Sequence, residues 1–323
     1  MESTARCKLL RAVFTQEKGC FGGPYSAEFQ IDNPVALQIE VNQLGTRIIN
    51  IISEVDVLVD DLYSVFTRIE RLLMLFDGRF FPLTELVFSD SSITSQEQLS
   101  ACSQHLLLQR LSYYRSSDFC ICSVNKLLDF NATLTAELYR KWEAVLLDLD
   151  IVHQVFLYSL CDNKQPVDMK CSFMIELAEP LVEIVKAHRH IFEGLNPGRK
   201  GTSLKQCLEA LVKQYGEQIF DKELSNDYDM DGFLQILVNS RVRIMHIKRR
   251  QQGQYLNGKE SMLYIVKMYL LYRCILFDLL GISISEYRDC LLKCISYWNN
   301  LNDAMAIFLH KIPKKADVQY IRS

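Results

Sequence analysis

From about residue 131 onward, apolar residues recur at the spacing of α-helices almost to the end of the chain, and this pattern limits the fold more than any other feature. Residues that favour turns are scarce, with 13 glycines and 7 prolines among 323 residues. Long helices joined by few loops are therefore expected, and a propeller or a β-sandwich is disfavoured. The predicted helices cover residues 134–161, 173–191, 203–215, 233–250, 259–280 and 284–310.

The first 95 residues combine strand and helix patterns. Strands are predicted over residues 25–31, 36–41 and 80–88, and a helix over 55–77 with Gly78 as its C-cap. Residues 89–104 are polar and rich in serine, which indicates a linker or an exposed loop. We therefore expect a mainly α chain with a small α/β N-terminal region (residues 1–95), a connecting segment (96–130) and a helical domain (131–323).

The charge and cysteine content indicate a cytoplasmic protein. The net charge of −3 excludes a globally basic nucleic-acid-binding protein, although it leaves room for a local basic patch. The N-terminal residues carry charges throughout, so no signal peptide is expected, and no apolar run reaches the roughly 18 residues of a membrane span. The 11 cysteines are accordingly predicted to be reduced and mostly buried.

A basic segment near the middle of the helical region has the residue types of a phosphodiester site. On an ideal helix, His246 lies about 60° from Arg243 and from Arg249, and about 40° from Arg250. Arg241 lies about 140° away, so it would reach the imidazole only through its long side chain, a distorted turn or a partner helix. The segment holds Asn239, Arg241, Arg243, His246, Lys248, Arg249 and Arg250.

Two interpretations of this segment remain open on the residues alone. Histidine exchanges protons near neutral pH, and the arginine guanidinium matches the geometry of phosphate oxygens, which together suit phosphodiester chemistry. The alternative is a solvated basic helix face that carries an incidental histidine.

The predicted helix over residues 259–280 is apolar around nearly its whole circumference. Such a helix lies either at the centre of a bundle or against a second subunit. Core packing and burial in a dimer are both compatible with the pattern.

The helical region resembles the HEPN domain, and within that family the ApeA-like branch known from bacterial abortive infection. The resemblance rests on Leu237-Val238-Asn239-Ser240-Arg241, four further residues and His246, followed by an apolar helix that ends in Phe277-Asp278-Leu279-Leu280-Gly281-Ile282. It covers roughly residues 131–310, and residues 168–188 look like the preceding helix of the branch. The residue after the arginine is usually polar in this family, whereas here it is Val242.

The resemblance implies a metal-independent endoribonuclease of antiphage defence that needs no cofactor. Arg241 and His246 would be catalytic, and RNA would be bound by Asn239, Arg243, Lys248, Arg249 and Arg250. Since the family generally assembles its site between two motifs and this chain has one, a homodimer is implied. The alternative is a catalytically inactive module that binds RNA or a nucleotide, which the apolar Val242 would favour.

Two further groups suggest metal ligands. Cys102, His105, Cys120 and Cys122 are suitable zinc ligands, although Cys-x-Cys is an awkward pair for one tetrahedral ion, so ordinary thiols are the prediction. Asp227-x-Asp229-x-Asp231-Gly232 begins like a calcium loop, but Val238 stands where the bidentate glutamate should be. An acidic cap at the start of a helix is predicted there instead.

Overall fold

The computed structural model describes residues 4–14, 24–32, 34–79, 81, 83–113, 125–160, 165–189, 191–192, 195, 202–246, 253–301 and 303–317. The chain divides into two compact units, one of residues 1–145 with 160–163 and one of residues 146–159 with 164–323. The prediction of a mainly α chain with an α/β N-terminal region is confirmed.

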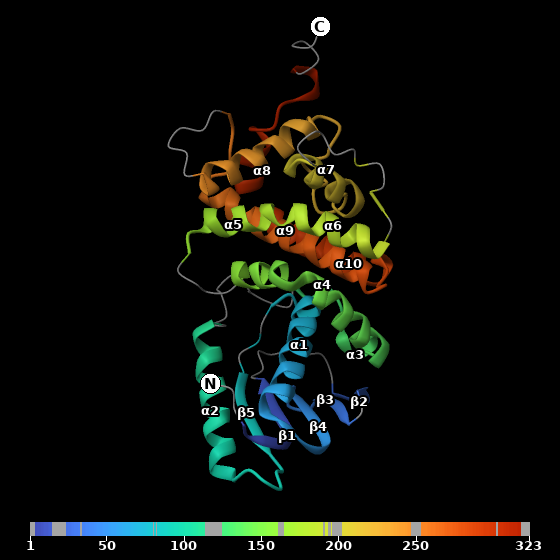
Figure 1. Cartoon of the computed structure of the whole chain (residues 1–323). Helices are drawn as coiled ribbons and strands as arrows, with labels where there is room; N and C mark the ends of the chain where they lie inside the picture. Colours follow the sequence, from blue (N-terminus) through green and yellow to red (C-terminus); the bar gives the residue numbers. More distant parts are fainter. Residues whose placement is uncertain are drawn as a thin grey trace. The chain divides into compact units, whose positions relative to one another are not determined.

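The N-terminal unit is built on a sheet. Within the described residues its strands pair antiparallel in the order β2-β3-β4-β1-β5, and α1 packs against β1 and β4 (Figure 1). Along β1, β3, β4 and β5, buried residues largely alternate with more exposed ones, which is the pattern of a sheet with one face on the core. The elements are β1 (Arg6–Phe14), β2 (Tyr25–Asp32), β3 (Val35–Val41), β4 (Arg47–Leu58), α1 (Val59–Asp77) and β5 (Leu83–Ser89).

Two of these strands, β1 and β4, were not predicted, and their pairing explains why α1 begins later than expected. Residues 55–58 were assigned to the helix, but β4 continues through them because Leu58 pairs with Arg6 and Val57 with Cys7. The C-cap prediction is confirmed: Gly78 has φ 79° and its N–H donates to the carbonyl of Met74.

The expectation that residues 89–104 form a loop is wrong for their second half. Helix α2 (Gln96–Tyr113) begins there, because the side chains of Ser95 and Gln98 each accept a hydrogen bond from the other residue's backbone N–H. The helix packs beside β5 with Leu99 buried and Leu106 and Leu107 half-buried, so a few apolar positions and a good cap form a helix in a serine-rich sequence.

Helix α9 (Gly258–Leu279) is the centre of the helical unit. Its residues from Leu263 to Phe277 are all buried, and the helices packed on it include α5, α10, α11, α7 and α6 of the same chain (Figure 1). Of the two alternatives for this helix, the bundle centre is therefore correct, and α9 by itself supplies no argument for a second subunit. The other helices are α3 (Phe130–Thr133), α4 (Ala136–Leu160), α5 (Val167–Glu176), α6 (Ala178–Arg189), α7 (Leu204–Tyr215), α8 (Met230–Met245), α10 (Ile284–Asn300) and α11 (Ala304–Leu309).

The single helix predicted over residues 173–191 is in fact the end of α5 followed by α6, with Leu177 between them. Pro180 explains the break, because it has no N–H to donate to the carbonyl of Glu176 and its ring crowds that carbonyl. None of the helices in the described ranges is both long enough and apolar enough to span a membrane.

Candidate functional site

The site is carried by α8, whose start is firmly held. Asp229 is the N-cap, and its Oδ2 accepts a hydrogen bond of 2.9 Å from the N–H of Gly232. The acidic-cap prediction is thereby confirmed. A Cβ on Gly232 would lie 2.6 Å from the ring of Pro313, so only glycine lets the C-terminal segment approach this turn.

Arg241 and His246 meet at the other end of α8. The Nη1 atom of Arg241 lies 3.3 Å from Nε2 of His246, where the guanidinium N–H donates when that ring nitrogen carries no proton. The five-residue spacing is bridged because the helix ends at His246, which is its C-cap with φ −102° and ψ 7°, and because the arginine side chain is long. The His246 ring is exposed, so a ligand can reach it.

Glu176, at the C-terminal end of α5, holds Arg241 in place. Its carboxylate accepts hydrogen bonds from Nε and Nη2 of Arg241, the second at 2.6 Å, and leaves Nη1 directed at His246. The bond to Glu176 raises the pKa of Arg241, so the guanidinium stays charged. The Arg241 and Glu176 side chains are 21% and 33% exposed, which places the pair at the rim of the bundle.

The loop that follows the site is tied to α8 by two polar side chains. Asn239 Nδ2 donates to the carbonyl of Gln254 at 3.0 Å, and Ser240 Oγ accepts from the N–H of Leu256 at 2.8 Å. The Arg243 guanidinium lies over the ring of Tyr255, 4.3 Å from its centre. The structure thus gives Asn239 and Arg243 contacts within the protein rather than beside the imidazole.

The remaining predicted basic residues, Lys248, Arg249 and Arg250, lie outside the described residues. The same holds for Cys120 and Cys122 of the weak zinc pattern. Among the residues that the structure does describe, no group of three or more His, Cys, Asp or Glu side chains could hold a metal ion.

A comparison with protein families assigns this part of the chain. Residues 162–286 match the family model described as Apea-like HEPN. The chain contains an Apea-like HEPN domain. The matched residues run from the segment before α5 to the start of α10, so Glu176, Arg241 and His246 all belong to the HEPN domain. No curated protein and no solved structure matches the chain.

This HEPN site combines a proton-transfer group, a cation and an orienting carboxylate. Such a set can move a proton at an exposed position and stabilise negative charge that develops next to it. Sequence reasoning missed Glu176, which lies 65 residues before Arg241. The available signal was weak: a carboxylate that ends an apolar helix four residues before a proline.

Proposed function

We propose that the chain is a metal-independent endoribonuclease of bacterial antiphage defence that acts in the cytoplasm. One observation carries the proposal: inside an Apea-like HEPN domain, the Arg241 guanidinium lies 3.3 Å from the exposed His246 ring. An acid–base group beside a fixed cation is what cleavage by an internal nucleophile requires.

In the proposed reaction, His246 accepts the proton of an RNA 2′-hydroxyl, and the 2′-oxygen bonds to the adjacent phosphorus. The bond from phosphorus to the 5′-oxygen breaks, and the imidazolium returns a proton to that oxygen. The products are a 2′,3′-cyclic phosphate and a 5′-hydroxyl. Arg241 stabilises the charge on the phosphorane, and Glu176 keeps Nη1 of Arg241 on the side of His246. Arg243, Asn239, Lys248, Arg249 and Arg250 are proposed to contact RNA.

The test is cleavage of a single-stranded RNA by purified protein in EDTA. The wild type should leave a 2′,3′-cyclic phosphate and should not cut DNA, which lacks the 2′-hydroxyl. His246→Ala and Arg241→Ala should each slow cleavage by about 10²–10⁴. His105→Ala is the matched control, since His105 is exposed on α2, outside the HEPN match. Full activity of the His246→Ala protein would disprove the assignment.

The proposed active form is a homodimer in which two copies of the Arg241–His246 pair face one RNA. The motif occurs once in this sequence, and pairing two sites would concentrate positive charge where RNA binds. Light scattering at micromolar concentration measures the mass. Mixing Arg241→Ala with His246→Ala protein then tests sharing: activity returns if one chain's arginine serves the other's histidine.

The second candidate is a domain that binds RNA without cutting it. Two observations favour it: Val242 follows the arginine where the family usually has a polar residue, and Glu176 already pairs with Arg241. This candidate predicts salt-sensitive RNA binding, no cleavage product, and weaker binding in the Arg241→Ala variant. The same RNA assay therefore separates the two functions.

A further inference from the structure

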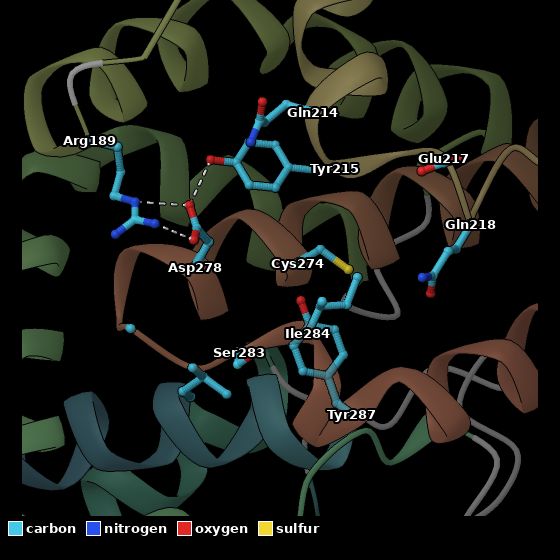
Figure 2. Close-up of a pocket in the computed structure, with 12 residues that line it drawn as sticks. Arg189, Gln214, Tyr215, Glu217, Gln218, Cys274, Asp278, Ser283, Ile284 and Tyr287 are labelled. Carbon is cyan, nitrogen blue, oxygen red and sulfur yellow. Dashed lines mark hydrogen bonds and ion pairs between the residues drawn. The ribbon is translucent and has the colours of Figure 1, made fainter.

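A second concave site lies in the helical unit and includes none of the residues assigned to cleavage. It is a pocket of about 460 Å³, a size within the range of small-molecule sites (Figure 2). The ends of α6 and α7, the C-terminal part of α9 and the start of α10 line it.

On one side of the pocket, the Asp278 carboxylate already accepts several hydrogen bonds from within the protein. Arg189 donates from Nε and Nη2 to the Asp278 carboxylate at 3.1 and 2.8 Å, and the Tyr215 hydroxyl donates to the same carboxylate at 2.9 Å. Figure 2 shows Arg189 and Tyr215 converging on Asp278. The positive charge of Arg189 is therefore matched by Asp278, and this cluster has little attraction left for an anion.

The neighbouring aromatic and thiol groups are neutral. Burial, together with the hydrogen bond to Asp278, raises the pKa of Tyr215, and burial raises the pKa of Tyr287. Burial also raises the pKa of the Cys274 thiol to about 12. These groups add polarisable and aromatic surface to the pocket without adding charge.

Two acceptors in the lining have no partner within the described part of the chain. The Glu217 carboxylate is exposed and takes no ion-pair or hydrogen-bond partner within the described part of the chain. Next to it, Oε1 of Gln218 is buried without a hydrogen-bond partner in the same residues. The Gln218 amide can donate or accept a hydrogen bond, whereas the Glu217 carboxylate can only accept. Glu217 therefore makes the pocket favour a ligand with hydrogen-bond donors.

From this geometry we propose that the pocket binds a small organic cation with N–H donors, namely a primary amine or a guanidinium. After Arg189 and Asp278 neutralise each other, Glu217 leaves the lining with one negative charge. The cation would donate to Glu217 and Gln218 and lie against the faces of Tyr215 and Tyr287. The proposal does not depend on RNA cleavage.

Calorimetric titration of the 323-residue chain tests this proposal, with putrescine and agmatine as probes. 1,4-Butanediol, of the same length as putrescine but uncharged, serves as the probe control, and AMP tests for an anion site. Both cations should bind at millimolar or lower concentration, while the diol and AMP should not. Glu217→Gln should weaken cation binding about tenfold or more, because a charge-assisted hydrogen bond is lost.

Asp221→Asn is the matched variant, since Asp221 is an exposed carboxylate four residues after Glu217 that does not line the pocket. It should leave the affinity unchanged, and Glu217→Lys should abolish binding while the circular dichroism spectrum stays that of the wild type. Three results would overturn the proposal: no binding of either cation, equal affinity in Glu217→Gln, or tighter binding of AMP than of agmatine.

Discussion

Two ion pairs in the helical unit each join a basic side chain to a glutamate, but one pair is buried and the other is partly exposed. Lys267 of α9 and Glu223 are 1% and 0% exposed, with Nζ 2.7 and 3.0 Å from the two carboxylate oxygens. The Tyr264 hydroxyl donates to the same carboxylate at 2.6 Å. Arg241 and Glu176, by contrast, lie at the rim and are 21% and 33% exposed.

The difference shows that burial decides whether a charged side chain only supports the fold or can also meet a ligand. The donors around Glu223 are enclosed, so removing one partner leaves a charge that neither solvent nor a ligand can reach. At the rim, water can replace a lost partner, and one nitrogen of Arg241 is directed at an exposed imidazole. The buried pair should therefore control stability, and the rim pair should control activity.

Glu223→Ala should have the largest effect on stability. It leaves the Lys267 ammonium buried without its carboxylate, which typically costs about 3–5 kcal/mol. Urea unfolding followed by circular dichroism measures the free energy. The double variant Glu223→Leu/Lys267→Met should recover much of the loss, because neither charge is then buried. A loss below about 1 kcal/mol in Glu223→Ala would remove the distinction between the pairs.

Alkaline pH should destabilise the buried interior of the helical unit, because it contains cysteine thiols with raised pKa values. Burial raises the pKa of Cys274 to about 12 and of Cys294 to about 11, from 9.0. Between pH 9 and these values the unfolded chain loses protons that the folded chain keeps, so stability falls as pH rises, by up to about 1.4 kcal/mol per pH unit for each thiol.

Urea unfolding at pH 8, 9, 10 and 11 tests this slope. Cys274→Ala should flatten it, although the variant loses some packing at every pH. Cys290→Ser is the control, because Cys290 is exposed and should leave the slope as it is. An equal slope in the Cys274→Ala and wild-type proteins would contradict the prediction.

Glu176→Gln should separate activity from stability at the rim. The amide keeps the shape of the side chain but removes the charge that holds Arg241, so cleavage should slow about tenfold, which corresponds to about 1.4 kcal/mol. The free energy of unfolding should change by less than about 1 kcal/mol, since the pair is partly exposed. Because Glu176 acts through Arg241, Glu176→Asp should regain part of the rate; a large stability loss would indicate a structural role instead.

Tyr255→Leu should have the smallest effect on the free energy of unfolding, measured by urea unfolding. It removes the ring under the Arg243 guanidinium, a cation–π contact between two half-buried side chains that is worth about 1 kcal/mol. The loss should disappear in an Arg243→Gln background, because a double-variant cycle isolates the pair. An additive effect of the two substitutions would mean that ring and guanidinium do not interact.

The predictions that succeeded depend on neighbours along the chain. Gly78 ends α1, and Asp229 caps α8, because each acts on backbone groups within four residues. The helical spacing of apolar residues in α7 and the all-round apolar character of α9 were visible for the same reason. The error over residues 89–104 came from composition, which outweighed the local pairing of Ser95 with Gln98.

What the sequence by itself determined is the helical class, most helix positions, the HEPN resemblance and the presence of Arg241 and His246 in one segment. The tertiary structure alone decided that β4 pairs with β1, that helices of the same chain cover α9, and that Glu176 holds Arg241. Periodicity and capping are short-range effects of backbone geometry, so they leave a mark in the sequence. A contact across 65 residues leaves none, because it depends on how separate helices pack.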